Sequence, residues 1–326
     1  MNANIHDRRI RKIFCLQRYL DILIKKIFIT GAGGFVGSEL VNGFSKLKYE
    51  VYALDKHFNY PIFENSKIIF YKKNLNKLNL SLKLKYVDYF IHTAAVTNPR
   101  KNLTKNSLIS NNLSLTKKAL YLAKKLKVKK FYFFSSTGVY RSDNSNFFDE
   151  KSKIYSLNEY AKSKILGEEI VRKFCIKNDL DYKILRLGNI YSGFEKKLWS
   201  RKNVSIFQKW LNNAYKDLIL KTNSFKTKRD WTYVKDIPLV INRIINSRNT
   251  KNVKLNLVSP YIREDIEMMR IISKKINKKN NFKEKLLFRV KHNASSSLYI
   301  KNFKFNKWTS PEKAINQIYK INNEKN

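Results

Sequence analysis

A glycine-rich stretch near the start of the chain restricts the possible folds more than any other feature. The stretch reads TGAGGFVG and runs from Thr30 to Gly37, directly after the apolar run Ile27–Ile29 and before the helix-like SELVNGFSKLK. Three of its glycines, at positions 31, 34 and 37, follow the spacing Gly-x-x-Gly-x-x-Gly. Gly31 permits a tight turn, Gly34 permits close approach to the backbone, and Gly37 permits close contact between helix and strand. The stretch therefore predicts a strand, a tight turn and a helix in succession.

The same succession of strand and helix is repeated along the first part of the chain. Apolar runs typical of strands are found at Lys26–Ile29, Glu50–Leu54, Ile68–Tyr71, Tyr89–His92, Phe131–Phe134 and Tyr182–Leu185. Helical stretches lie between several of them, notably Ser107–Leu126 and Tyr155–Lys177. Continuous apolar strands separated by helices are typical of a parallel sheet covered on both faces. We therefore predict an α/β fold with a doubly wound parallel sheet of the Rossmann type.

The pattern also suggests how the chain is divided. Residues 1–24 contain the Arg-rich DRRIRK and no uninterrupted apolar segment, so we expect a disordered basic extension or a mis-assigned translation start. Residues 25–192 are expected to form the Rossmann-type domain. The alternation loosens after that, and residues 193–326 are expected to form mainly a smaller C-terminal lobe that binds the substrate, with part of 226–250 returning to the first domain.

Charge and cysteine content limit the classes of partner. The chain has 67 Lys and Arg against 25 Asp and Glu, a net charge of +42, but its lysines are scattered over every segment. We therefore favour a compositional bias that attracts small anions over a specific nucleic-acid site. Cys15 and Cys175 are far apart, without metal-ligand spacing, which indicates reduced thiols in a cytoplasmic protein and no metal site. No apolar run reaches the roughly 18 residues of a membrane span.

The context of the glycines indicates a dinucleotide site. A helix that begins directly after such a turn presents backbone amides and a partial positive charge to a pyrophosphate. Asp55 ends the next strand, where its carboxylate can accept hydrogen bonds from both ribose hydroxyls. This favours NAD over NADP, although Lys56 directly after it weakens the discrimination. A glycine-rich turn without a ligand is the alternative.

The segment YAKSK supplies a candidate reaction centre. Tyr160 and Lys164 are four residues apart on a predicted helix, so both project from one face. The phenol, with an ordinary pKa near 10, is a poor base at neutral pH, but a nearby ammonium and an oxidised nicotinamide would lower that pKa. Lys164 can also hold the nicotinamide ribose. Ser136, at the end of the strand in FFSSTGVY, can bind a substrate hydroxyl. Chance occurrence is the alternative for the Tyr-Lys pair considered alone.

These motifs together resemble the extended short-chain dehydrogenase/reductase family, specifically its NAD-dependent epimerase/dehydratase group acting on nucleotide sugars. The resemblance extends from Lys25 to about Tyr319 and is carried, in order, by TGAGGFVG, HTAAV, NNLSLT, FSSTGVY, YAKSK, RLGNIY and RDWTYVKD. It implies NAD as the cofactor, a nucleotide-diphosphate sugar as the substrate, and a homodimer.

The resemblance also implies roles for individual residues. It makes Tyr160 the acid/base and Lys164 its partner. Ser136 becomes the hydroxyl residue, Thr137 can share that role, and Asn112 is a buried support. The implied cofactor-binding residues are Gly31, Gly34, Phe35, Val36, Gly37, Asp55, Asn74, Leu75, Ala94 and Ala95, together with the tyrosine and lysine.

On the substrate side the resemblance implies a second group of residues. Arg229 in RDWTYVKD matches the arginine that contacts the substrate diphosphate or nucleotide, and guanidinium suits phosphate. Asn189 in RLGNIY, Asn203 in NVSIFQKW and Arg289 in LFRVKH complete the candidates, with Ser136 as a shared residue. For Asn203 and Arg289 a solvated surface position is the alternative.

Several positions depart from the family pattern. Asn74 stands where an Asp is frequent near the adenine, and its amide can still bind. Ser192-Gly193 replaces the usual Gly-Pro, and Arg141 follows VY where Gly is usual. Dehydratases of the group usually carry an Asp-Glu pair where this chain has Thr137 and Gly138, which disfavours elimination of water.

The sequence thus favours an NAD-dependent epimerase or keto-reductase of a nucleotide-diphosphate sugar. An NAD(P)-binding sensor or scaffold of the same fold without turnover, and a nucleotide-sugar dehydratase, are the alternatives. Nucleic-acid binding through the charge has no recognised motif to support it.

Overall fold

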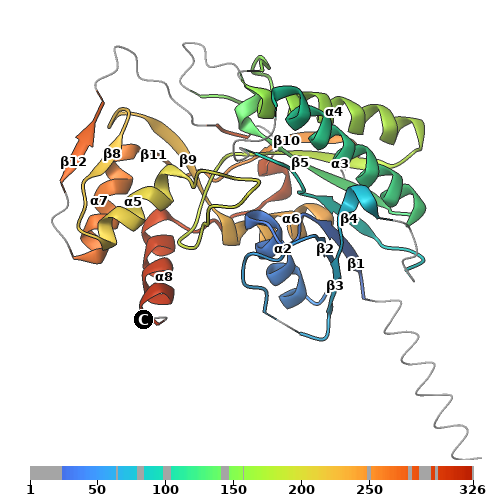
Figure 1. Cartoon of the computed structure of the whole chain (residues 1–326), viewed down its shortest axis with the longest axis horizontal. Helices are drawn as coiled ribbons and strands as arrows, with labels where there is room; N and C mark the ends of the chain where they lie inside the picture. The colour runs from blue at the N-terminus through green and yellow to red at the C-terminus, as the bar shows by residue number, and fades with distance from the viewer. Residues whose placement is uncertain are drawn as a thin grey trace, which may run out of the picture.

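The computed structural model shows a seven-stranded parallel sheet at the centre of the molecule (Figure 1). It describes residues 24–63, 65–78, 84–97, 104–140, 147–156, 158–247, 251–277, 281–285, 295–297 and 300–324. The strands run in the order β3-β2-β1-β4-β5-β6-β10 and all six pairings are parallel. Their bounds are β1 Lys26–Thr30, β2 Glu50–Asp55, β3 Ile68–Lys72, β4 Tyr89–His92, β5 Lys130–Ser136, β6 Asp181–Leu187 and β10 Val253–Leu257. The predicted Rossmann-type fold is confirmed.

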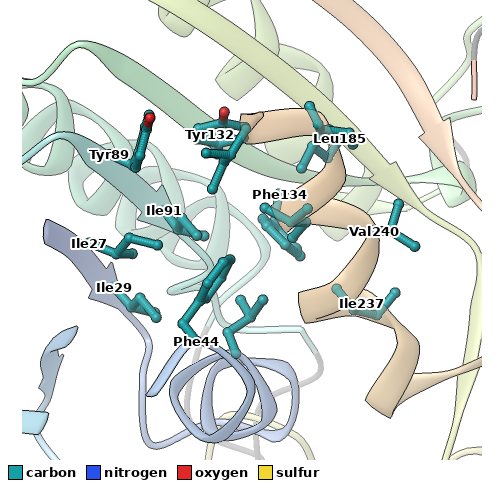
Figure 2. Packing of buried hydrophobic residues seen from close by; sticks show 14 of the residues in the cluster. Ile27, Ile29, Phe44, Tyr89, Ile91, Tyr132, Phe134, Leu185, Ile237 and Val240 are labelled. Carbon is teal, nitrogen blue, oxygen red and sulfur yellow. The ribbon is translucent and has the colours of Figure 1, made fainter. Parts of the chain in front are cut away.

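Helices cover both faces of this sheet. Helices α3 (Lys105–Lys125) and α4 (Glu159–Lys177) pack together on one face, and α2 (Phe35–Lys46) and α6 (Ile237–Ile245) pack on the other (Figure 1). Side chains alternate along the strands, so β1, β2, β4, β5 and β6 contribute buried side chains to both layers. The layer under α2 and α6 is drawn in Figure 2; it includes Ile27, Ile29, Phe44, Ile91, Phe134, Leu185, Ile237 and Val240.

One helix begins later than the sequence pattern predicted. We expected a helix over Tyr155–Lys177, but α4 begins at Glu159. The side chain of Asn158 accepts a hydrogen bond from the backbone N–H of Ala161 and so caps the helix. The backbone of Tyr155 instead donates to the carbonyl of Val139. The expected start at Tyr155 was wrong because the local cap lies three residues further on.

The C-terminal part of the chain builds a smaller lobe beside the sheet (Figure 1). Its helices are α5 (Ile206–Tyr215), α7 (Asp265–Ile276) and α8 (Pro311–Asn323). They pack with β7 (Asn189–Tyr191), β9 (Lys228–Tyr233) and β11 (Ile262–Glu264), which form one sheet, and with β8 (Leu220–Thr222) and β12 (Phe282–Glu284), which form another. The core of this lobe is rich in aromatic and methionine side chains, among them Trp210, Trp231 and Met268.

Two C-terminal elements lie on the large sheet. Helix α6 buries Ile237, Val240 and Ile241 in the layer that it shares with α2. Strand β10 pairs with β6 and becomes the edge of the sheet. The return therefore includes β10, beyond the segment 226–250 that the sequence indicated. Residues 1–23 lie outside the described part of the chain, and no helix among the described residues is long and apolar enough to cross a membrane.

The strand order creates a crevice at one edge of the sheet. The chain fills positions to one side of β1 with β2 and β3, and then returns to the other side with β4. The loops after β1 and β4 consequently leave the same edge in opposite directions, which is where ligands bind in open parallel sheets.

Candidate functional site

The turn between β1 and α2 holds its glycines in close contact with other backbone. Gly31 has a φ of +76°, and a Cβ there would lie 2.6 Å from the backbone nitrogen of Ala94. A Cβ at Gly37 would lie 2.0 Å from the Gly31 carbonyl oxygen. A Cβ at Gly34 would meet that same oxygen at 3.2 Å, which is tight but not a severe overlap. The packing thus requires glycine at positions 31 and 37, whereas at position 34 a side chain would have space on one side.

A fourth glycine in this stretch was missed by the sequence analysis. A Cβ at Gly33 would lie 1.9 Å from the carbonyl oxygen of His57, in the loop after β2. The backbone N–H of Gly33 donates to the carboxylate of Asp55 at 3.1 Å. The double glycine of the stretch was the available signal, and the partner loop could not be identified without the fold.

One pocket at the sheet edge surrounds Asp55. This Asp55 pocket is lined by Gly31, Gly34, Leu54, Asp55, Lys56, His57, Asn59, Lys73, Asn74, Leu75, Asn76, Thr93, Ala94, Ala95, Val96, Asn111, Leu115, Leu198, Trp199 and Ser200. The Asp55 carboxylate also accepts the backbone N–H of His57. Burial raises the pKa of Asp55, and hydrogen bonds from the backbone of His57 and Gly33 lower it. The predicted residues Asn74, Leu75 and Ala94 are all brought here, and the Asn74 side chain accepts the backbone N–H of Asn76.

A second pocket lies next to it and surrounds Tyr160. This Tyr160 pocket is lined by Gly31, Gly34, Phe35, Val36, Gly37, Tyr60, Thr93, Ala95, Thr97, Phe134, Ser135, Ser136, Tyr160, Lys164, Leu187, Gly188, Ile190, Leu198, Ser200, Arg201 and Asn203. The two pockets share Gly31, Gly34, Thr93, Ala95, Leu198 and Ser200. They are therefore two halves of one cleft across the edge of the sheet.

The Tyr160 pocket combines a phenol with two cations. The Nζ of Lys164 donates to the carbonyl oxygen of Phe134 at 2.7 Å and lies 5.7 Å from the centre of the Tyr160 ring. Burial raises the pKa of Tyr160 to about 12, and the positive charge of Arg201 lowers it. Burial lowers the pKa of Lys164 to about 8, and the carboxylate of Glu168 raises it. Besides Lys164, which the sequence indicated, the pocket therefore places a second positive charge, that of Arg201, where it lowers the pKa of the phenol.

The other predicted catalytic residues occupy different places around this pocket. Ser136 ends β5, and its Oγ accepts the backbone N–H of Gly138 at 3.1 Å. Thr137 begins the short 3-10 turn η2 (Thr137–Val139) and is not among the described lining residues. Asn112 is buried in α3. Its side chain bonds to both the N–H and the carbonyl of Val96 and donates to Ser163 Oγ in α4, so it ties the loop after β4 to two helices.

A buried ionic network lies behind the pocket. Arg186 on β6 and Glu168 on α4 form a two-point ion pair with distances of 2.8 and 2.6 Å. Glu168 also accepts the hydroxyl of Ser135 at 2.6 Å, and Arg186 donates to the hydroxyl of Tyr140. Every strong polar group of this network has a partner, which is what makes buried charge tolerable. The network fixes α4, and with it Tyr160, against the sheet.

Two predicted substrate residues, Arg229 and Asn189, are not brought into the cleft, and a third cannot be placed. Arg229 forms a two-point ion pair with the buried carboxylate of Asp265, at 2.8 and 3.2 Å, and does not line either pocket. Asn189 turns to Asp230, bonding through its backbone and its side chain. Arg289 lies outside the described residues. The role expected of Arg229 therefore stays a prediction, with a geometry that does not favour it.

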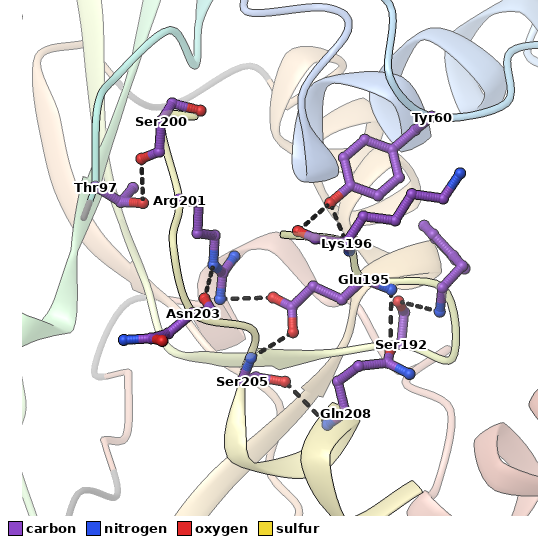
Figure 3. A network of polar contacts seen from close by, with 11 residues as sticks. Tyr60, Thr97, Ser192, Glu195, Lys196, Ser200, Arg201, Asn203, Ser205 and Gln208 are labelled. Atoms are coloured by element: carbon purple, nitrogen blue, oxygen red, sulfur yellow. Dashed lines mark hydrogen bonds and ion pairs between the residues drawn. The ribbon is translucent and has the colours of Figure 1, made fainter. Parts of the chain in front are cut away.

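The segment 198–203 crosses the cleft, although the sequence predicted almost no role for it. It contains Leu198, Trp199, Ser200, Arg201 and Asn203, and all five line one or both pockets. The carbonyl of Ser200 accepts hydrogen bonds from the backbone and the hydroxyl of Thr97 (Figure 3). On the Asp55 side, the ammonium of Lys56 lies 3.5 Å from the centre of the Trp199 ring. Only Asn203 had been singled out, because the segment has no periodic pattern.

The shape of the cleft and its hydrogen-bond donors fit a dinucleotide. Gly34 lines both halves of the cleft and is the N-cap of α2. Within the described chain, no side chain caps this helix and its first turn has no acidic residue. The free amides and partial positive charge of such a helix end attract a phosphate anion. The described residues contain no group of three or more His, Cys, Asp or Glu that could hold a metal ion.

Comparisons with known proteins agree with this arrangement. A dTDP-D-glucose 4,6-dehydratase of Dictyostelium discoideum is 29% identical over 72% of this chain and 58% of its own. A Methanocaldococcus jannaschii protein, provisionally named a UDP-glucose 4-epimerase, is 28% identical over 74% of this chain and 82% of its own. The structure of a UDP-N-acetylglucosamine 4-epimerase from Methanobrevibacter ruminantium M1 superposes with a TM-score of 0.81 at 19% identity, covering 93% of this chain and 99% of the other.

A family profile covers the elements that build the cleft. The profile of the NAD dependent epimerase/dehydratase family matches residues 27–258, from the first strand of the large sheet to just beyond its last. Both the glycine turn and the helix that carries Tyr160 lie inside this match. The chain belongs to the NAD dependent epimerase/dehydratase family.

Proposed function

We propose that the protein is an NAD-dependent epimerase, or keto-reductase, of a nucleotide-diphosphate sugar. The observation that carries the proposal is the single cleft that joins the glycine turn to Tyr160, Lys164 and Ser136. A cofactor held by the glycine turn would lie beside the phenol, the ammonium and the hydroxyl. The sequence relatives support this class of substrate, because they are named for work on nucleotide sugars.

Different residues of the cleft would bind different parts of the cofactor. The Asp55 carboxylate would bind the ribose diol, and Asn74 and Leu75 would border the adenine. The amides at the start of α2, next to Gly34, would hold the pyrophosphate. Lys164 would reach the second ribose. When bound there, NAD supplies the acceptor and donor of a hydride. We further propose that residues 25–192 hold the cofactor and that residues 193–326 provide most of the sugar-nucleotide contacts.

The chemistry assigned to the chain's own residues is proton transfer. Tyr160 removes the proton of a sugar hydroxyl and later returns a proton to the same oxygen. At pH 8, a phenol with a pKa of about 12 is four units from ionisation, which costs about 5.5 kcal/mol. Because this pKa already includes the charge of Arg201, further positive charge, such as that of an oxidised nicotinamide bound in the cleft, would have to lower it. Ser136 accepts one backbone N–H and keeps its own O–H, which can hold the sugar oxygen in place.

The two alternatives remain distinguishable. Elimination of water requires a general acid after the active-site serine, and Thr137 and Gly138 cannot serve in that way. A sensor or scaffold without turnover would bind NAD in the same cleft and convert no substrate. A keto-reductase would release a product with a net change in oxidation state. We also propose a homodimer and a cytoplasmic location, both on the basis of the family resemblance.

The test is to incubate the NAD-loaded protein with a panel of nucleotide-diphosphate sugars. Mass spectrometry and proton NMR of the sugars then separate the four outcomes. An epimer with unchanged mass is the expected result, while a mass change of two hydrogens identifies a reductase. Loss of water identifies a dehydratase. NAD binding without any product from the whole panel would favour the sensor.

A further inference from the structure

The connection between β7 and α5 holds a positive charge against the Tyr160 pocket. Figure 3 shows Arg201 on this connection, facing Glu195 from the same connection. The Nη2 of Arg201 lies 2.5 Å from the Glu195 carboxylate, and its Nε donates to the carbonyl oxygen of Asn203 at 3.2 Å. The guanidinium also lies 5.6 Å from the centre of the Phe35 ring. Arg201 is therefore fixed in place, yet its side chain keeps 30% of its exposure.

Glu195, which pairs with this arginine, is itself held in place by contacts within the lobe. The Glu195 side chain is 1% exposed, and its second oxygen accepts the backbone N–H of Ser205 at 2.6 Å. The backbone N–H of Glu195 donates to the side chain of Gln208 in α5. Because Glu195 does not line the pocket while Arg201 does, the carboxylate holds the guanidinium from behind. Such a preorganised cation loses little side-chain entropy when it binds an anion.

Arg201 is the cation of this pocket that remains open to a ligand. Among the described lining residues, the cationic ones are Lys164 and Arg201. Lys164 is buried and already donates to a carbonyl oxygen. Within the described chain, the Nη1 group of Arg201 forms no hydrogen bond or ion pair, whereas Arg229 presents both Nε and Nη2 to the buried Asp265. Binding an anion through Arg229 would therefore disturb a buried ion pair, while binding through Arg201 would not.

We infer that Arg201 is a substrate-binding residue that receives a negatively charged oxygen of the substrate inside the Tyr160 pocket. This inference rests on the proposed function and specifies which charge of the chain recognises the sugar nucleotide. The oxygen belongs either to the diphosphate or to a carboxylate on the sugar, since guanidinium binds both in the same geometry. The positive charge of Arg201 also lies near the phenol of Tyr160, which must ionise.

The test measures affinity and does not depend on turnover. The NAD-loaded parent and its Arg201→Gln variant are titrated calorimetrically with UDP, UDP-glucose and UDP-glucuronic acid. A hydrogen bond to a charged group corresponds to about a tenfold to hundredfold change in Kd. Equal weakening of all three probes identifies a phosphate contact, and selective weakening of UDP-glucuronic acid identifies a carboxylate contact. Unchanged affinity for all three would overturn the inference.

Matched variants test whether a loss of affinity has a cause other than the loss of the contact between Arg201 and the substrate. Glu195→Gln together with Arg201→Gln avoids leaving a buried carboxylate unpaired, and it should show the same loss as Arg201→Gln. Arg172→Gln removes an arginine from an exposed Arg-Glu pair and should bind all probes like the parent. Loss of affinity in Arg229→Gln, with Arg201→Gln unaffected, would assign the role to Arg229 instead. If the parent itself binds NAD but neither these probes nor any other nucleotide-diphosphate sugar of the panel, the proposed function fails and this inference fails with it.

Discussion

Alanine substitutions at two neighbouring glycines should separate packing from cofactor binding. In Gly37→Ala the new Cβ would lie 2.0 Å from the carbonyl oxygen of Gly31 and 2.7 Å from its carbonyl carbon. Real Cβ atoms essentially never come within 3.0 Å of such atoms, so α2 must move by about 1 Å relative to β1. Overpacking of this kind costs about 1–3 kcal/mol. We therefore expect a lower melting temperature together with weaker NAD binding.

Gly34→Ala should behave differently. Its Cβ would meet one oxygen at 3.2 Å, and the backbone at Gly34, with φ −82° and ψ 175°, suits alanine. Stability should remain near that of the parent, since reduced entropy of the unfolded chain offsets a small steric cost. Because Gly34 lines both halves of the cleft, its methyl group would occupy the path of the pyrophosphate. A steric cost of about 1–3 kcal/mol there corresponds to about 5- to 150-fold weaker NAD binding.

Thermal melts and NAD titrations of both variants provide the assay. The expected pattern is loss of both properties in Gly37→Ala and loss of affinity alone in Gly34→Ala. A Gly34→Ala protein that binds NAD like the parent would refute the placement of the pyrophosphate. A Gly37→Ala protein with the parent's melting temperature would refute the packing argument.

Three further predictions follow from the contacts of individual carboxylates. Asp55→Asn should reduce the preference for NAD over NADP in calorimetric titrations, and an unchanged preference would remove Asp55 from the ribose site. Glu168→Gln leaves the buried Arg186 without its counter-charge, so urea denaturation should show a loss of about 3–5 kcal/mol in the free energy of unfolding; a loss below about 1 kcal/mol would contradict this. Burial raises the pKa of Asp230 from 3.8 to about 7, so its contribution to stability is complete below about pH 4 and is lost as pH rises through 7. The melting temperature of the parent minus that of Asp230→Asn should therefore be greater at pH 5 than at pH 8, and a pH-independent difference would show that Asp230 does not titrate in this range.

The sheet could be predicted because its signals are local. Most of the buried strands, such as Tyr89–His92, are continuous apolar runs. The closely spaced glycines after β1 predict the turn. The start of α4 also had a local signal, since Asn158 lies at a capping position, but the apolar pattern before it suggested an earlier start. Strand β10 was missed because its sequence, VKLNL, is not a continuous apolar run and because it pairs with β6, far away in the sequence.

The rim of the cleft could not be predicted, because it depends on contacts between distant segments. Position 33 requires glycine because a Cβ there would overlap the carbonyl oxygen of His57. Arg201 is held in position by Glu195, which is itself bound at the start of α5. Arg229 fits the family motif, yet Asp265, from a different element, occupies its guanidinium. A motif indicates a residue type at a position in the chain, but only the fold shows which partner that residue has.

The most direct test of the proposed chemistry is the turnover of Tyr160→Phe with NAD and the nucleotide sugar that the parent converts. The substitution removes only the ionisable hydroxyl, so the fold and the Kd for NAD should be nearly unchanged. General acid-base catalysis is worth about a hundredfold to ten-thousandfold, and kcat should fall by at least about a hundredfold. A Tyr160→Phe protein that binds NAD and turns over like the parent would contradict the assignment and place the proton transfer elsewhere.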